Sequence, residues 1–306
     1  MTWIAFTIFA AFMQSIRTAG QKSMGNHFSP MGNTCVRYLF SWPWAAIYAL
    51  AIYLLTPNLT VTLSVEYFIY AAIAGICQIA ATAMLVALLT HGNFAVGTVF
   101  SKSEVLLTAI LGSLFFTEVL SHFAWWGIIL CSLGLFFLIF KSASNAPTSL
   151  VKLVPWLQEN LDYKSAVLGL GSGGGFALTA LFIKDANNTL NTDPFIASSL
   201  CLFTMISMQT VFMCIYLIKF EPDQFKWMGT EFKKASFIGI TSLLGSIGWF
   251  TALALTQASY VRAVGQVELI FALLISRWYF HAPPSRFELF AMVIVSLGIL
   301  LVILEG

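Results

Sequence analysis

The sequence predicts an all-α polytopic membrane protein in which ten transmembrane helices form two inverted repeats of five. Three observations predict this fold class: the composition, the length of the apolar segments and an internal repeat. Of the 306 residues, 59% are hydrophobic and only 9% are charged, whereas soluble domains carry about 25% charged residues. Because so few charged side chains cannot cover one domain of this size, most of the surface must face lipid.

Ten apolar segments are long enough to cross a bilayer as helices, since about 20 residues at about 1.5 Å rise per residue span its core. Their residues are apolar on every side instead of alternating, which favours helices over the strands of a barrel. The first five segments are Trp3–Gly20, Asn33–Leu55, Tyr67–Thr90, Phe94–Phe116 and Phe123–Phe140. The second five segments are Ser165–Ile183, Phe195–Leu217, Ala235–Leu255, Tyr260–Phe280 and Phe287–Leu304.

A longer polar stretch separates the two groups of helices. We therefore predict a first repeat over residues 1–140, a linker over residues 141–164 and a second repeat over residues 165–306. Within the linker, apolar residues recur at helical spacing from Leu150 to Leu161. This spacing predicts a short amphipathic helix that lies on the membrane surface.

An internal repeat relates the two groups of helices. A single offset of 164 residues, without gaps, pairs Glu104 with Glu268, Pro30 with Pro194, and Ser132-Leu133-Gly134 with Ser296-Leu297-Gly298. Because each group has an odd number of helices, the second copy must enter the membrane from the opposite side. Such a repeat has a pseudo-two-fold axis in the membrane plane and two packings of similar energy, which alternating access requires.

The order of these motifs resembles the drug/metabolite transporter superfamily, in its ten-helix EamA-type family. The resemblance covers essentially the whole chain, with a second copy over residues 260–301, and rests on Ala95-Val96-Gly97, Ser103-Glu104-Val105-Leu106, Leu114-Phe115-Phe116-Thr117-Glu118, Trp126-Gly127-Ile128 and Ser132-Leu133-Gly134. It implies a transporter, within a superfamily that handles amino acids, amines, nucleotide sugars and drugs.

The chain departs from this family at two motifs. Members usually have a glutamate-proline pair in helices four and nine, but Val105 and Leu269 stand where the prolines would be. Glu118 matches the family's acid at the end of helix four, whereas the second copy has Ala282. Neither glutamate is therefore followed by a proline hinge.

Counting from the predicted helix ends places Glu104 about ten and Glu268 about nine residues inside, roughly 14 Å deep, with Lys102 almost as deep. A charge there costs about 2.5–3.5 kcal/mol on insertion scales, so it must face a partner or water. We expect these three residues, the repeat-related Gln266 and the polar Gln78 to line a central site. A glutamate balanced between burial and a nearby cation could exchange a proton for substrate. The alternative is a fixed ion pair such as Lys102–Glu268.

A second polar cluster is expected where helix one and the start of helix two lie near the same membrane side, with Gln14, Arg17, Arg37 and Tyr38. Each arginine lies only about four residues from the membrane edge, so it either extends to the interface or recognises a carboxylate or phosphate. The embedded cations, counted with Lys102, outnumber the two embedded glutamates. This excess favours an anionic or zwitterionic substrate.

The remaining aromatic, glycine, cysteine and histidine residues give little sign of a catalytic or metal site. Of Trp249, Tyr260 and Trp278, only Trp249 is deep enough to line the site. The glycines at 169–175 predict close helix packing or a flexible break instead of a phosphate loop. The five cysteines and four histidines lack metal-ligand spacing, so we expect no metal and no other cofactor. A net charge of +2 without a basic stripe disfavours nucleic acid as a partner.

These features favour a secondary active transporter that moves a small, amino-acid-like metabolite by alternating access, coupled to protons and in the direction of export. One alternative is a cationic drug or amine transporter of the same fold, although helix one offers only Gln14 where such proteins carry an acid. The other is a passive channel. An intramembrane enzyme is disfavoured because the apolar segments contain no Ser/His dyad or metal-binding set.

The expected setting is the inner membrane of a bacterium, with the substrate, protons and lipid as partners and the protein as a monomer or homodimer. Lysine and arginine are concentrated in the connectors opposite the termini. The positive-inside rule then places both termini outside the cytoplasm, whereas the family resemblance implies termini inside. We favour the placement that the charges indicate.

Overall fold

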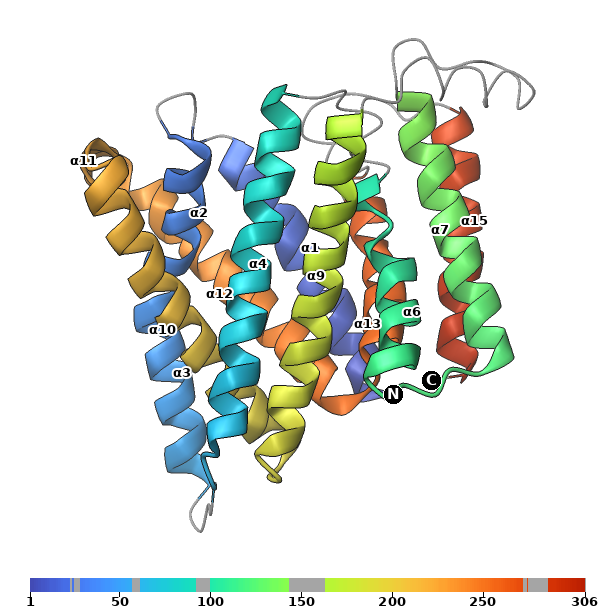
Figure 1. Cartoon of the computed structure of the whole chain (residues 1–306), viewed down its shortest axis with the longest axis horizontal. Helices are drawn as coiled ribbons and strands as arrows, with labels where there is room; N and C mark the ends of the chain where they lie inside the picture. The colour runs from blue at the N-terminus through green and yellow to red at the C-terminus, as the bar shows by residue number, and fades with distance from the viewer. Residues whose placement is uncertain are drawn as a thin grey trace. The chain divides into compact units, whose positions relative to one another are not determined.

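The computed structural model describes residues 1–22, 24, 28–56, 61–91, 100–142, 163–271, 274 and 286–305. The regular secondary structure within these residues is helical (Figure 1). The amphipathic helix expected between Leu150 and Leu161 lies outside them.

In the described residues, the helices of the first half follow the predicted segments, with turns at Phe40–Ser41 and at Lys102–Ser103. They are α1 (Thr2–Lys22), α2 (Pro30–Leu39), α3 (Trp42–Leu55), α4 (Val65–His91), α6 (Glu104–Phe115) and α7 (His122–Ser142). The span predicted over Asn33–Leu55 is found as Pro30–Leu55, and a turn at Phe40 and Ser41 divides it into α2 and α3. The Ser41 hydroxyl there lies 2.5 Å from the carbonyl oxygen of Arg37 and 2.8 Å from that of Gly239.

In the described residues, the helices of the second half follow the predicted segments, apart from the additional helix α11 and an interruption after α13. They are α9 (Tyr163–Thr189), α10 (Pro194–Phe220), α11 (Asp223–Thr230), α12 (Phe232–Leu255), α13 (Ala258–Val264), the short 3₁₀ helix η2 (Gly265–Val267) and α15 (Arg286–Glu305).

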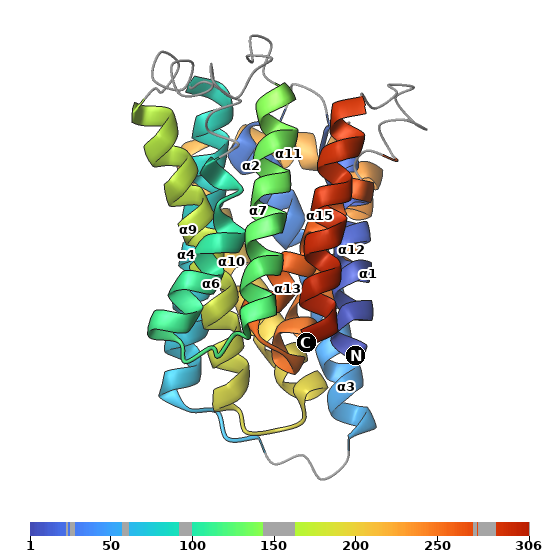
Figure 2. The same cartoon turned by 90° about the vertical axis from the view of Figure 1, so that its right-hand side faces the viewer.

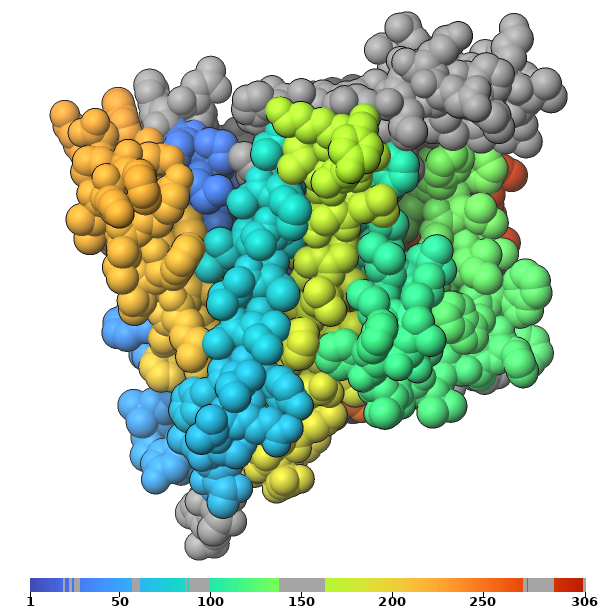
Figure 3. All heavy atoms as spheres, in the orientation of Figure 1, coloured from blue at the N-terminus to red at the C-terminus, as the bar shows by residue number. Residues whose placement is uncertain are grey.

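Several of these helices have the length and composition of membrane spans. Five helical stretches of the described chain qualify, namely Pro30–Leu55, Val65–Leu85, Tyr163–Thr189, Pro194–Phe220 and Phe232–Leu255. Shorter apolar helices cover Glu104–Phe115, His122–Phe137 and Leu289–Leu304. Large apolar side chains such as Leu54 and Ile215 are exposed. Figure 3 shows the surface formed by α4 and α9. In a membrane these side chains would contact lipid tails.

The helices form two compact units that cut across the repeats. Unit 1 comprises residues 1–76 and 179–257, and unit 2 comprises residues 77–178 and 258–306. Each unit therefore contains helices from both halves of the sequence. The long helices α4 and α9 each contribute one end to each unit.

In unit 1, α1 packs along α12, and α2 and α3 pack on α10. The helices α2 and α10 begin alike: Pro30 and Pro194 each occupy the first turn, after the capping residues Ser29 and Asp193. Proline is favoured there because the first helical N–H groups have no partner within the helix. These prolines are the pair that the repeat aligned.

In unit 2, α7 and α15 lie side by side (Figure 2). A Cβ atom on Gly298 would lie 2.7 Å from the backbone nitrogen of Cys131, and one on Gly134 would lie 3.0 Å from that of Val295. The Cys131 thiol also donates to the carbonyl oxygen of Val295 at 3.6 Å, across 164 positions of sequence. Residues that the repeat makes equivalent therefore contact one another, as a two-fold axis between the two helices requires.

Contacts between two further pairs of helices, α4 with α9 and α1 with α12, are also related by the offset of 164 residues. In unit 2 the glycines Gly171 and Gly175 of α9 lie against Met84 and Ala81 of α4. The residues 164 positions after Ala81 and Met84 are Gly245 and Gly248 of α12, and in unit 1 these two glycines lie against α1. Small residues thus permit close approach in both equivalent helix pairs. Of the two alternatives for the glycines of α9, Gly171 and Gly175 show close packing.

Candidate functional site

Both glutamates that the repeat pairs follow an interruption of their helix. The helix α6 begins at Glu104, directly after a turn at Lys102 and Ser103. In the second repeat α13 ends at Val264, η2 follows, and Glu268 comes next. The continuous helices predicted over Phe94–Phe116 and Tyr260–Phe280 are therefore wrong at these points, although neither glutamate is followed by proline.

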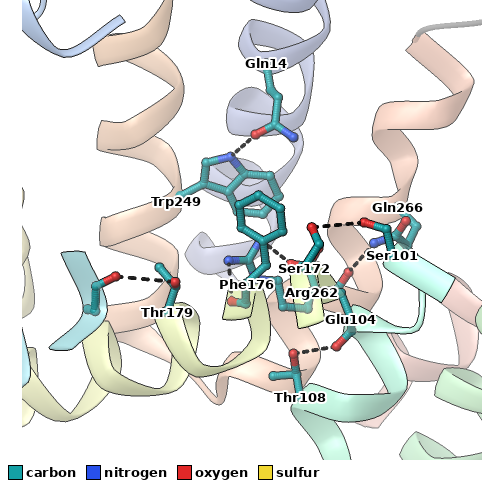
Figure 4. Close-up of polar contacts among 11 residues, drawn as sticks. Gln14, Ser101, Glu104, Thr108, Ser172, Phe176, Thr179, Trp249, Arg262 and Gln266 are labelled. Atoms are coloured by element: carbon teal, nitrogen blue, oxygen red, sulfur yellow. Dashed lines mark hydrogen bonds and ion pairs between the residues drawn. The ribbon is translucent and has the colours of Figure 1, made fainter. Parts of the chain in front are cut away.

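The turn before Glu104 is held against α9 by a glycine. A Cβ atom on Gly173 would lie 2.8 Å from the Ser101 carbonyl oxygen and 3.2 Å from the Glu104 backbone nitrogen. The Ser101 hydroxyl donates to the Ser172 hydroxyl at 3.4 Å (Figure 4). The absence of a side chain at Gly173 allows α9 to touch the backbone of the turn, so the glycine-rich helix supports this site.

The main polar feature of unit 2 is an ion pair between the repeats. Arg262 Nη1 on α13 lies 2.7 Å from Glu104 Oε1 on α6, and the two side chains are only 18% and 13% exposed. Arg262 Nη2 also donates to the Phe176 carbonyl oxygen of α9 at 3.4 Å. The Gln266 side-chain amide donates to the Arg262 carbonyl oxygen at 3.1 Å, next to the interruption by η2 (Figure 4). The cluster thus unites α6, α9 and α13.

Glu104 has its partner on another helix, in Arg262 of α13. Because Lys102 and Glu104 are two positions apart and point to different sides of a helix, each was expected to find its partner on another helix, with a fixed Lys102–Glu268 pair as the alternative. Lys102 lies half-buried in the turn. Glu268 is half-buried after η2.

Sequence reasoning missed Arg262. It lies close to the start of the predicted ninth segment, where an arginine usually extends to the membrane interface. One signal in the sequence could have identified Arg262, because it lies in the same apolar segment as Glu268. An embedded charge of each sign suggests pairing, but the partner lies in the other repeat.

A second missed residue is Glu118, just after α6. Its carboxylate is 5% exposed and accepts hydrogen bonds from the backbone N–H groups of Ala258 and Ser259, at 2.6 and 3.2 Å. The Ser259 hydroxyl donates to it at 2.5 Å. The resemblance to a family motif was its only signal in the sequence.

The predicted polar residues of helices one and two fall in unit 1. The Trp249 indole N–H on α12 donates to Gln14 Oε1 on α1 at 3.0 Å (Figure 4), which joins two residues that the sequence proposed separately. Arg17 is half-buried on α1. The Arg37 guanidinium lies 5.3 Å from the ring centre of its neighbour Tyr38, whose side chain is buried.

The remaining candidate, Gln78, lies half-buried on α4 within unit 2. The Thr82 hydroxyl donates to its backbone carbonyl oxygen at 2.8 Å. The described residues contain no group of three or more His, Cys, Asp or Glu side chains that could hold a metal ion.

Comparison with known proteins gives a family and a fold. The model of the EamA-like transporter family matches residues 1–140 and 163–304. A search of curated proteins finds no match. A solved crystal structure, described only as that of a protein, has a TM-score of 0.75 and 13% sequence identity, covering 100% of this chain and 99% of that chain. At this identity the likeness concerns the fold alone.

Proposed function

Because the chain belongs to the EamA-like transporter family, we propose that it is a secondary active transporter that moves a small metabolite by alternating access. The observation that carries this proposal is the half-buried Glu104–Arg262 pair. One charge comes from each repeat, and each lies beside an interrupted helix. Interrupted helices with facing charges are the usual construction of a binding site in the membrane interior.

The ion pair restricts the chemistry of the substrate. A substrate carboxylate can replace Glu104 on the guanidinium of Arg262, which offers a planar, two-pronged set of donors. A substrate ammonium can then bind Glu104. A zwitterion therefore supplies an opposite charge to both residues, whereas a simple cation that binds Glu104 supplies no carboxylate to Arg262. Lys102 lies two residues from Glu104 and adds positive charge, so an anionic or zwitterionic, amino-acid-like substrate is favoured over a cationic drug.

The same pair offers a route for proton coupling. If Glu104 takes up a proton, it loses the charge that holds Arg262, and the guanidinium becomes available to a substrate carboxylate. Release of the proton would restore the ion pair and expel the substrate. The proposed direction of net movement is export, across a bacterial inner membrane. The proposed site also contains the second glutamate, Glu268, and the polar side chains of Gln266 and Gln78. Gln14, Arg17, Arg37, Tyr38 and Trp249 form its counterpart in unit 1.

A binding experiment tests the choice of substrate class. The purified full chain is heated in the presence of phenylalanine, of 3-phenylpropionate, which lacks the ammonium, or of phenethylamine, which lacks the carboxylate. The same comparison is made with short aliphatic amino acids and their analogues. We expect a zwitterion to raise the unfolding temperature most, because a ligand that binds the folded state stabilises it. Stabilisation by the amines alone would indicate a cationic drug transporter instead.

A variant assigns that binding to the site. Arg262→Gln should weaken the apparent affinity for the zwitterion by about tenfold or more, because the substrate carboxylate loses its partner. Stabilisation by the zwitterion should fall accordingly. The control is Lys234→Gln, which breaks the exposed Lys234–Glu231 pair and should leave binding unchanged. Equal binding by Arg262→Gln and the unmodified protein would contradict the proposed site.

Reconstitution tests coupling. In proteoliposomes that carry a pH gradient, accumulation of the bound zwitterion should require the gradient and should be lost in Glu104→Gln. Flux that only follows the substrate gradient in the unmodified protein would indicate a passive channel. The control is Glu66→Gln, which should leave transport unchanged. Glu66 lies in the first turn of α4 and accepts a hydrogen bond from the Tyr70 hydroxyl.

A further inference from the structure

The buried carboxylate of Glu118 holds the beginning of α13. Three donors converge on it: the N–H groups of Ala258 and Ser259 and the Ser259 hydroxyl, at 2.6, 3.2 and 2.5 Å. The first N–H groups of a helix lack partners within it, and a negative charge is favourable there. Because α13 has only seven residues before η2, it depends strongly on such external contacts.

Glu118 is itself fixed by the end of α6. Thr117 adopts a left-handed backbone conformation, with φ 55°, and the Glu118 N–H donates to the Gly112 carbonyl oxygen at 3.0 Å. A Cβ atom on Gly112 would lie 2.7 Å from Glu118 Oε2. The chain reversal and the missing side chain at position 112 together direct the carboxylate toward α13.

The residue that α13 must place is Arg262. It lies three positions after Ser259, on the same side of the helix, and its guanidinium meets Glu104 at 2.7 Å. Glu104 is the first residue of α6, and Glu118 follows the last turn of the same helix. The α6 segment therefore holds α13 at two points, once at its beginning and once through its charged side chain.

We propose that Glu118 is a positioning residue of the transport site, which sets the location of Arg262 relative to Glu104 through the N-terminus of α13. This inference rests on the proposed function, because it concerns the same ion pair. The repeat-equivalent position is Ala282, so the first repeat supplies this carboxylate and the second repeat has none. Through Glu118, the first repeat holds a helix of the second.

An infrared titration of the purified full chain measures the effect on Glu104 directly. The carbonyl band of protonated Glu104 is identified by its loss in Glu104→Gln. In Arg262→Gln the midpoint of this band's titration should move, because the cation at ion-pair distance from Glu104 is removed. Glu118→Gln and Ser259→Ala should each move the midpoint in the same direction, by a part of that shift.

Two controls separate positioning from general stability. Ser198→Ala removes another buried serine near the start of a helix, α10, and Glu66→Gln removes a peripheral carboxylate; neither should move the midpoint. If Glu118→Gln does not fold, Ser259→Ala still carries the test.

The possible outcomes distinguish the two proposals. A lower unfolding temperature in Glu118→Gln and Ser259→Ala with an unchanged midpoint would mean that Glu118 supports the fold alone, which would overturn the inference. An unchanged midpoint in Arg262→Gln would overturn the ion pair on which both proposals depend. A midpoint that moves in all three variants but not in the controls would support positioning.

Discussion

Single residues determine the site, and their partners lie far away in the sequence. Glu104 could be identified as a candidate because a carboxylate inside an apolar segment needs a partner or water. Its partner Arg262 could not, since only the folded chain brings the two atoms to 2.7 Å. The same is true of Gln14 and Trp249, which were predicted separately and meet through a hydrogen bond of 3.0 Å.

A substitution at Gly112 should test how closely Glu118 is enclosed. We expect Gly112→Ala to destabilise the protein by about 1–3 kcal/mol, because the added carbon would overlap the Glu118 carboxylate and force it from its place. Unfolding of the purified protein followed by circular dichroism measures the change.

The matched control is Gly229→Ala in α11, where a Cβ atom would meet nothing within 4 Å. Alanine should leave the stability unchanged or raise it by about 0.4–1 kcal/mol, because glycine loses more backbone entropy on folding. Equal effects of the two substitutions would show that the space around Gly112 is open.

The segments predicted to begin at Asn33 and Phe195 begin within three residues of those positions, whereas the helix interruptions were not predicted. Pro30 and Pro194 begin α2 and α10, as the fixed φ of proline favours. The turn at Lys102–Ser103 and the 3₁₀ segment η2 have no proline, and the first depends on the approach of Gly173 from another helix. A local pattern cannot reveal an interruption that a distant glycine permits.

The contact between α7 and α15 yields a prediction for a whole element. Gly298→Ala should destabilise the protein by about 1–3 kcal/mol, because its Cβ would lie 2.7 Å from backbone atoms of α7 that cannot move aside. Thermal unfolding measures the loss.

In the helix α9, Gly174→Ala serves as the comparison, since its Cβ would meet only Leu107 Cδ1 at 4.0 Å. This change should have little effect or a small stabilising one. A loss of stability as large as that of Gly298→Ala would mean that helix glycines are needed for flexibility instead of close packing.

At the scale of the molecule, the all-α polytopic fold follows from composition and from the repeat, which are properties of the whole chain. The helical structure and the match of the family model over both halves confirm it. The two compact units were not predicted, because each mixes helices of both halves. Sequence similarity records which segments are copies, whereas packing decides which segments share a core.

Orientation in the membrane can be tested on the full chain. Basic residues in the connectors opposite the termini include Lys219, Lys226, Lys233 and Lys234, so we expect the C-terminus outside the cytoplasm. Alkaline phosphatase fused there should be active in a bacterial host. A fluorescent protein that folds only in the cytoplasm should stay dark in the same position, and bright cells would reverse the assignment.

The contact between α7 and α15 also bears on ancestry. Gly134 meets Ala291 and Val295, and Gly298 meets Gly127 and Cys131, the equivalent positions of the other copy. Such reciprocity defines an isologous interface, of the kind that joins two identical chains. Two separate five-helix chains would associate through this surface, and gene duplication with fusion would retain it. Once fused, each side can change alone, as Gly127 and Ala291 already differ while both central glycines are kept.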